Sequence, residues 1–208
     1  MGVIIEPSEA SGEGAVKVST VWARQTRFLH FGLATTVTFQ LFMSLAMEAP
    51  KAGRTRSAIE SLSFEAHEWV GMAALAIVMA HWIWSLTARD NSNIRHLFPW
   101  GKKGLASVMQ DLQGLMKMKL PEGGGRGGLP GFVHGLGFLA ATGMALTGGV
   151  LFFVLPEDGS RNELARLFHN IHGFIANFVW AYWGGHLATA ILHKKMGHDT
   201  VKNMFHLG

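Results

Sequence analysis

Cysteine is absent from the 208-residue chain, and its absence excludes several kinds of redox centre. Disulfides, iron–sulfur clusters held by thiolates and covalently attached c-type haem all require cysteine. Charge is also scarce: 15% of the residues are charged whereas 49% are hydrophobic, a composition typical of a membrane protein. Eleven histidines are present, more than a chain of this size needs for packing. Any redox cofactor must therefore be held by ligands other than cysteine.

The N-terminal region lacks the apolar core of a cleavable signal peptide. It contains Glu6, Glu9 and Glu13 and is otherwise rich in small and polar residues. We therefore predict that residues 1–20 form a flexible tail.

Four apolar stretches follow, each long enough to cross a bilayer as a helix. We predict membrane spans at about 28–47, 64–86, 130–155 and 168–193. Short polar loops join the first span to the second and the third to the fourth, so these neighbours run antiparallel. The chain is therefore predicted to be an all-α membrane protein built as a four-transmembrane-helix bundle.

The connection between the second and third spans is long and polar, from Thr87 to about Gly128. Within it, residues 102–120 place apolar side chains at helical spacing. These side chains are Leu105, Val108, Met109, Leu112, Leu115 and Met116. The stretch is too polar to cross a bilayer. We predict an amphipathic helix that lies on the membrane surface, under a partner subunit or against the protein's own loops.

Lysine and arginine are distributed unequally between the two sides of the predicted bundle. The two tails and the long connection carry thirteen of them, whereas the two short loops carry five. Positive charge is enriched in the cytoplasmic segments of membrane proteins. We therefore predict that both termini and the long connection are cytoplasmic.

Two histidines of the fourth span, His172 and His186, are 14 residues apart. That separation is about 3.9 turns and about 21 Å of an α-helix, so both lie near one face, one toward each side of the membrane. Ionisable side chains inside a span are costly and usually functional. Axial ligands of two b-type haems stacked across a membrane would have this geometry. Gly173, Gly184 and Gly185 beside them leave room for a flat macrocycle.

Histidines on the other spans lie at matching depths. The outer side has His67, His169 and His172, and the cytoplasmic side has His30, His81, His134 and His186. At the outer side, we predict that His67 pairs with His172; His169 is the alternative, but it lies outside the apolar run and off the 14-residue spacing. At the cytoplasmic side, depth alone leaves the pair open among four candidates.

Several short patterns occur in order along the chain. They are Arg27 with His30 at the start of the first span, His67 with Gly71 at the start of the second, the paired histidines of the fourth, and the ending H-L-A-T-A-I-L-H-K-K-M-G-H-D-T-V-K-N-M from His186 to Met204. Together they resemble the bacterial cytochrome b561 and hydrogenase-type di-haem cytochrome b subunits. That superfamily includes the membrane cytochromes of formate dehydrogenases, hydrogenases and thiosulfate reductases. The resemblance implies a cytochrome domain over residues 21–206, located in the bacterial inner membrane.

The resemblance also implies two ligand sets. The inner haem would take His30 and His186, and the outer haem His67 and His172, so that the fourth span holds both irons. Arg27, one turn before His30, could pair with a propionate of the inner haem.

Two further histidines have open roles in this comparison. His134 resembles a third-span histidine that lies near a propionate or a quinone in many relatives. His81 departs from the family pattern and stays an alternative inner ligand, because with His67 it mimics the two-ligand helix of a different cytochrome b architecture. We predict that quinone reacts on the inner side near His134, with Trp82, Trp84 and Trp100 available to wall its pocket.

The predicted function is transmembrane electron transfer by a di-haem b-type cytochrome between a redox partner and the quinone pool. Its cofactors would be two haem b, with quinone as a diffusible substrate and membrane lipid as the surroundings. The partner would be a soluble or periplasmic redox subunit or cytochrome, with a homo-oligomer also open, and the chain would be an electron-transfer subunit of an oxidoreductase complex. One alternative is a free-standing superoxide:quinone oxidoreductase of the small b561 type, and another is a non-haem channel or metal transporter.

Overall fold

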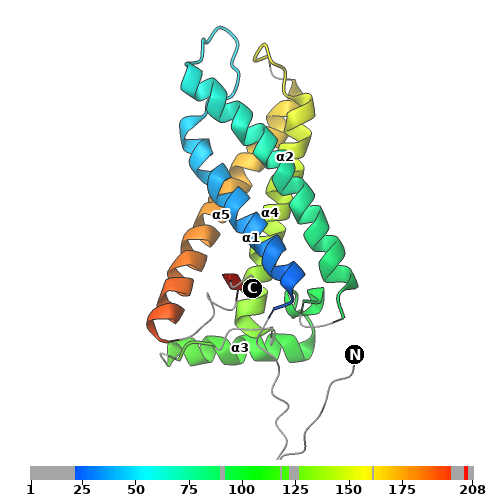
Figure 1. Cartoon of the computed structure of the whole chain (residues 1–208), viewed down its shortest axis with the longest axis vertical. Coiled ribbons are helices and arrows are strands. Elements are labelled where there is room, and N and C mark those ends of the chain that lie inside the picture. Colours follow the sequence, from blue (N-terminus) through cyan, green and yellow to red (C-terminus); the bar gives the residue numbers. More distant parts are fainter. Residues whose placement is uncertain are drawn as a thin grey trace, which may run out of the picture.

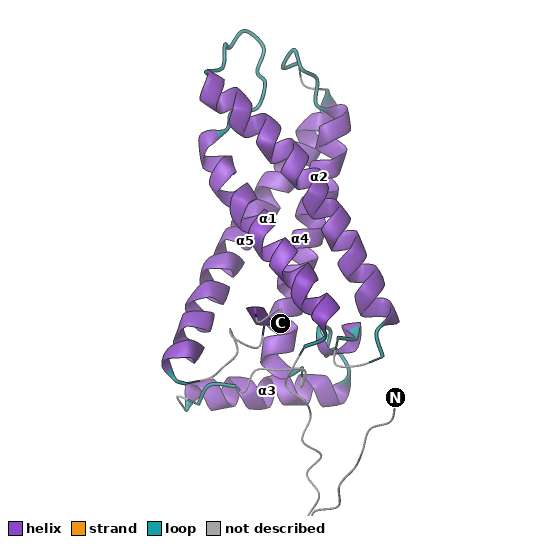
Figure 2. Cartoon of the chain, in the orientation of Figure 1, coloured by secondary structure: helices purple, strands orange, loops and turns teal. Residues whose placement is uncertain are grey.

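A computed structural model describes residues 22–89, 92–117, 119–121, 127–160, 162–197 and 204–205, and no strand occurs among them (Figure 2). The helices are α1 Arg24–Ala46, α2 Ala58–Thr87, the 3-10 helix η1 Ile94–His96, α3 Lys102–Met116, α4 Gly128–Val154 and α5 Glu163–Lys195. The predicted all-α fold is confirmed for this part of the chain, and the predicted tail of residues 1–20 lies outside it.

The four long helices run together along the long axis of the molecule, and α3 lies across one end of them (Figure 1). We call this the α3 end. The opposite end, formed by the α1–α2 and α4–α5 loops, is called the loop end. Toward the α3 end, α5 diverges from the other long helices (Figure 1).

Two of the long helices begin at side-chain caps at the loop end. Before α2, the Ser57 hydroxyl accepts a hydrogen bond from the Glu60 N–H at 3.2 Å, and the Glu60 carboxylate accepts one from the Ser57 N–H at 2.7 Å. Before α5, the Asn162 side chain accepts a hydrogen bond from the Ala165 N–H at 2.7 Å. These caps satisfy N–H groups that the first turn of a helix leaves unpaired.

Three helices in the described part of the chain, α1, α2 and α4, are long and apolar enough to cross a membrane. The protein is therefore a multi-pass membrane protein. The fourth predicted span corresponds to α5, which is 33 residues long and carries four histidines and two terminal lysines that lower its mean hydropathy. That α5 also crosses the membrane stays a prediction.

Hydrogen bonds from tryptophan to threonine join the long helices across their interfaces. One bond links α2 to α1, one links α2 to α4, and one links α5 to α1. The pairs are Trp84–Thr26 at 2.9 Å, Trp82–Thr142 at 3.0 Å and Trp183–Thr38 at 3.0 Å. An indole N–H inside a membrane has no water to bind, so each bond favours one rotation of the two helices it joins.

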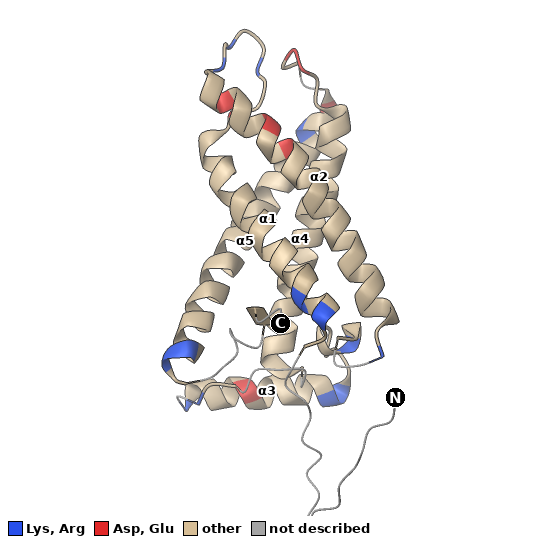
Figure 3. Cartoon of the chain, in the orientation of Figure 1, with Lys and Arg blue, Asp and Glu red and all other residues tan. Residues whose placement is uncertain are grey.

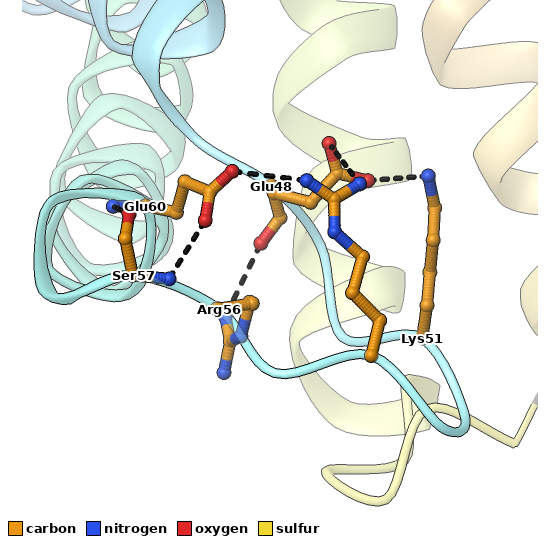
Figure 4. Close-up of polar contacts among 6 residues, drawn as sticks. Glu48, Lys51, Arg56, Ser57 and Glu60 are labelled. Atoms are coloured by element: carbon orange, nitrogen blue, oxygen red, sulfur yellow. Dashed lines mark hydrogen bonds and ion pairs between the residues drawn. The ribbon is translucent and has the colours of Figure 1, made fainter.

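The two loops at the loop end are packed on each other. The Glu48 carboxylate pairs with Lys51 and, at 3.4 Å, with Arg54, which also reaches Glu60 at 3.0 Å (Figure 4). The hydrogen bond from Lys51 and the charge of Arg54 lower the pKa of Glu48. From the other loop, Gly159 has a φ of +76° and lies so close to the backbone of Lys51 that no Cβ would fit.

Charge differs between the two ends of the molecule (Figure 3). Among the described residues, the α3 end carries ten lysines and arginines and the loop end four. The ten are Arg24, Arg27, Arg89, Arg95, Lys102, Lys103, Lys117, Lys119, Lys194 and Lys195, and the four are Lys51, Arg54, Arg56 and Arg166. The described part of the chain therefore keeps the bias seen in the whole sequence.

Candidate functional site

A pair of histidines meets near the loop end, between α2 and α5. The rings of His67 and His172 face each other with their centroids 6.4 Å apart and their planes inclined at 78°. His67 lies near the start of α2, and His172 lies near the start of α5. We call them the loop-end pair.

A second pair meets near the α3 end, between α1 and α5. The ring centroids of His30 and His186 are 6.2 Å apart, with an interplanar angle of 57°. Because His172 and His186 are 14 residues apart on one helix, this α3-end pair lies about 21 Å along α5 from the loop-end pair.

The spacing within each pair suits a metal ion between the rings. Two imidazoles that bind one metal on opposite sides, each through a bond of about 2.0 Å from a nitrogen about 1.1 Å off the ring centre, have centroids about 6.2 Å apart. The two observed separations, 6.4 Å and 6.2 Å, match this value. Open space also adjoins α5 at both depths, because a Cβ added at Gly173, Gly184 or Gly185 would meet no atom within 4 Å.

The Thr147 hydroxyl of α4 lies within hydrogen-bonding distance of the His172 ring. The Thr147 hydroxyl donates its only proton to the Gly143 carbonyl at 2.7 Å, with the Met144 carbonyl at 3.1 Å. The same oxygen lies 2.9 Å from His172 Nδ1, and when the hydroxyl proton goes to a carbonyl this oxygen accepts a hydrogen bond from an Nδ1–H group. His172 Nε2 is then unprotonated and available as a metal ligand.

The other member of the loop-end pair is held through its backbone. Gln40 of α1 donates a hydrogen bond from Nε2 to the His67 carbonyl at 2.8 Å. His67 Nδ1 is buried and has no hydrogen-bond partner among the described residues. The predicted alternative, His169, is exposed on α5 three residues before His172.

The α3-end pair has more aromatic neighbours than the loop-end pair. The ring of Tyr182 stacks on His186 at 5.5 Å and 14°, and His134 of α4 approaches the same ring edge-on at 5.1 Å. The Phe205 ring lies 5.6 Å from that of His30. His186 is therefore positioned by a tyrosine one turn earlier on its own helix and by an imidazole from α4.

His134 also has a determined tautomer. Its Nδ1 lies 2.6 Å from the Pro130 carbonyl oxygen, which can only accept, so Nδ1 carries the proton. Its Nε2 is then left with a lone pair that can accept a hydrogen bond.

The ring of His81 packs on another aromatic side chain. The His81 ring packs on Phe138 with a centroid distance of 4.7 Å, and its Nδ1 lies 3.1 Å from the Ser85 hydroxyl. No ring contact joins it to His30 or His186 within the described residues. Arg27 lies one turn before His30 on α1, as the sequence requires.

Three residues of the site were not predicted. Thr147 offered no sequence signal, because a threonine in an apolar span is common. Gly137 permits the close approach of α5: an added Cβ would collide with the Tyr182 ring. Tyr182 could have been found, because it is the only tyrosine of the chain and stands four residues before His186, on the same helix face.

Histidines paired at two depths in a multi-pass helical protein are the arrangement expected of a membrane cytochrome with b-type haem. The chain belongs to the prokaryotic cytochrome b561 family, whose model matches residues 21–207. The predicted family is thereby confirmed. Membership implies that the protein binds haem b and transfers electrons across a membrane. Neither the curated proteins nor the solved structures gave a match to the chain.

Proposed function

We propose that the protein is a di-haem cytochrome b that carries electrons across the bacterial inner membrane between a redox partner and the quinone pool. The observation that carries this proposal is the pair of facing imidazoles at each of two depths on α5, each at the spacing of two ligands to one metal. His67 and His172 would hold the loop-end haem, and His30 and His186 the α3-end haem.

The ligand residues would serve each haem by staying neutral and fixed in orientation. A haem iron with two imidazole ligands has no open coordination position, so it exchanges electrons instead of binding oxygen. Thr147 supports this role because it holds the Nδ1 proton of His172 and leaves Nε2 to the metal. Arg27 is placed on α1 where it could pair with a propionate of the α3-end haem.

The proposed topology has α5 as a fourth span, with both termini and the α3 end in the cytoplasm. Three observations support it. The 33 residues of α5 exceed the length that a bilayer needs, and α5 is joined to α1 by the Trp183–Thr38 hydrogen bond. The ten described lysines and arginines at the α3 end, against four at the loop end, favour that end as the cytoplasmic one.

The proposed quinone site lies beside the α3-end pair, next to His134. A quinone needs a polar group for its carbonyl at about the depth of the headgroups, close to a haem edge. His134 is 5.1 Å from His186, and Trp82, Phe98 and Trp100 form a continuous set of ring contacts nearby. Electrons would then pass between this side and a redox partner docked at the loop end.

The first experiment is a reduced-minus-oxidised visible spectrum of the purified protein with quantitation of haem. Two b haems per chain are expected. One haem per chain would contradict the di-haem proposal, and no haem would favour a channel or metal transporter.

The second experiment tests the quinone site. Reduced protein in liposomes should be reoxidised by a quinone analogue, and His134→Ala should slow that step while both haems remain. His193→Ala, a histidine further along α5, serves as the matched control and should reoxidise at the wild-type rate. Equal rates in His134→Ala and wild type would remove His134 from the site. Rapid quinone reduction by superoxide, with no co-purifying partner, would favour the free-standing superoxide:quinone oxidoreductase instead.

A further inference from the structure

The helix α3 packs on the rest of the protein through a face of small and polar residues. Asp111 accepts a hydrogen bond from the Leu129 N–H at 2.9 Å, and Ser107 lies beside it on the same face. One turn earlier, Gly104 lies against Pro99 so closely that no Cβ would fit. The face that contacts α4 is therefore not the apolar face of this amphipathic helix.

Four of the six apolar side chains of α3 named above form a second face that the described residues leave uncovered. Leu105, Met109, Leu112 and Met116 follow one another at spacings of four, three and four residues, which places them in one stripe. Their side chains are 48%, 54%, 44% and 82% exposed, respectively.

A third face of α3 is polar. Lys103, Gln110, Gln113 and Lys117 are exposed and fall in one sector of the helix. At 3.6 residues per turn, the packed, apolar and polar faces are centred roughly 120° apart. Three such faces are typical of a helix that contacts protein on one face, lipid on the second and water on the third.

The depth and direction of α3 place it at a membrane boundary. It lies across the ends of the long helices (Figure 1). The hydrogen bond from Leu129 to Asp111 fixes it beside the first turn of α4, where that candidate span begins. A helix that crosses the spans at this level runs along the membrane surface.

The charges of α3 favour a negatively charged surface. Lys102 and Lys103 stand at its start, and Lys117 and Lys119 stand at or just past its end. Its one acidic residue, Asp111, faces the protein and accepts the Leu129 hydrogen bond. A cleft of about 460 Å³ between η1, α3 and α4 adds Arg95 to the basic groups around Lys103.

We propose that α3 is an interfacial helix that docks on the anionic phospholipids of the leaflet at the α3 end, with its apolar stripe inserted at the boundary of headgroups and acyl chains. The lysines at both ends bind lipid phosphates, and Asp111 transmits the position of the leaflet to the first turn of α4. This inference rests on membrane insertion alone and does not depend on the number of haems or on quinone.

The absence of cysteine makes the test direct, because single cysteines can be introduced without background labelling. Met109→Cys and Leu112→Cys report on the apolar stripe, and Gln110→Cys and Gln113→Cys are matched controls on the polar face of the same turns. Each full-length variant is labelled with an environment-sensitive fluorophore in nanodiscs containing phosphatidylglycerol. A quencher carried by the lipid acyl chains should reduce the fluorescence at the stripe at least about twofold more than at the controls, whereas aqueous iodide should show the opposite order.

Three outcomes would overturn the proposal. Equal access of iodide to both faces would show that the stripe lies in water. Protection of the stripe from both quenchers would show that protein covers it, either a partner subunit or a second copy. Unchanged quenching in nanodiscs of phosphatidylcholine alone, or in Lys102→Gln/Lys103→Gln, would show that anionic lipid is not the recognised surface. Every labelled position is exposed, so the substitutions should leave the fold intact. Retention of the haem spectrum checks that each variant is folded.

Discussion

The two histidine pairs are alike in spacing and different in surroundings. Their ring centroids are 6.4 Å and 6.2 Å apart, and each pair joins α5 to one other helix. The loop-end pair has one hydrogen-bonding side chain, Thr147, on the ring of His172. The α3-end pair has a third imidazole, His134, and the stacked ring of Tyr182 against His186.

The difference separates two tasks of the histidines: holding a metal, and exchanging protons with a diffusible substrate. Holding a metal needs two imidazoles that each present an unprotonated nitrogen, and beside its two rings the loop-end pair has the Thr147 hydroxyl at His172. A site that also exchanges protons with a diffusible substrate needs an additional polar group at hydrogen-bonding distance. The α3 end has such a group in His134, whose Nε2 is left free by the bond from Nδ1 to Pro130.

The largest expected effect comes from removing one α5 ligand at a time. His172→Ala should lose the loop-end haem alone and His186→Ala the α3-end haem alone, because about 21 Å of helix separates them. Haem per chain and the visible spectrum measure the loss, with His193→Ala as the control. Retention of both haems with unchanged spectra in either variant would refute α5 as the shared ligand helix.

The next comparison decides the partner of His186. We expect His30→Ala to lose one haem and His81→Ala to retain both, because the His30 ring faces His186 whereas His81 packs on Phe138. The same haem quantitation applies. The reverse result, with one haem in His81→Ala and two in His30→Ala, would transfer the ligand role to His81.

A smaller effect is expected from crowding the α3-end pair. In Gly137→Ala the new methyl group would collide with the Tyr182 ring and push it against His186. Overpacking of this kind costs about 1–3 kcal/mol, and we expect a changed midpoint potential for the α3-end haem only. Gly143→Ala is the matched control, because its Cβ would meet the flexible end of Ile175 at 3.1 Å. An equal change in both haems would show a general loosening of the bundle.

Removing the hydrogen bond to His172 tests the loop-end pair in the same way. Thr147→Val keeps the shape of the side chain but removes the hydroxyl that lies 2.9 Å from His172 Nδ1. Loss of such an outer partner typically lowers metal affinity about 10–100-fold, so the loop-end haem should dissociate more readily while the α3-end haem stays. Competition with a haem-binding apoprotein measures this, and Thr36→Val, whose hydroxyl bonds to the Gly32 and Leu33 carbonyls of its own helix, is the control.

The smallest expected effect concerns the loop-end ion pairs. The pKa of Glu48 is lowered from its usual 4.5, so its pairing stabilises the fold above that pH and is lost as the pH falls through the lowered value. From about pH 7 to about pH 3, the melting temperature of wild type should therefore fall more than that of Glu48→Gln. The difference should be slight, because exposed ion pairs contribute little to stability. Both haem spectra should be unaffected, and Glu157→Gln should behave as wild type. A haem change in Glu48→Gln would mean that the loops help to shape the loop-end pair.

Much of this architecture was predictable because it depends on local periodicity. The composition and apolar stretches predict a helical membrane protein, and the structure is helical wherever it is described. The apolar spacing between residues 102 and 120 predicts the helix α3, which ends at Met116, where the N–H groups of Lys117 and Lys119 both bond to the Gly114 carbonyl. The family resemblance, based on short motifs in order, is confirmed by the match over residues 21–207.

The depth of each histidine also followed from the sequence, because depth along a helix is a count of residues. Depth also pairs His67 with His172, but it leaves the cytoplasmic pair open among four histidines. The ring contact of His30 with His186, and the packing of His81 on Phe138, depend on how α1, α2 and α4 are rotated around α5.

By itself, then, the amino-acid sequence determined the class, the helices and the two levels at which imidazoles occur. Only the tertiary structure decided which side chains orient them: Thr147 beside His172, and Gly137 and Tyr182 beside His186. It also decided that α3 turns its small polar face to the protein and leaves its apolar stripe uncovered. The physical reason is that periodicity within one helix defines its faces, whereas contacts between helices far apart in sequence decide what each face meets.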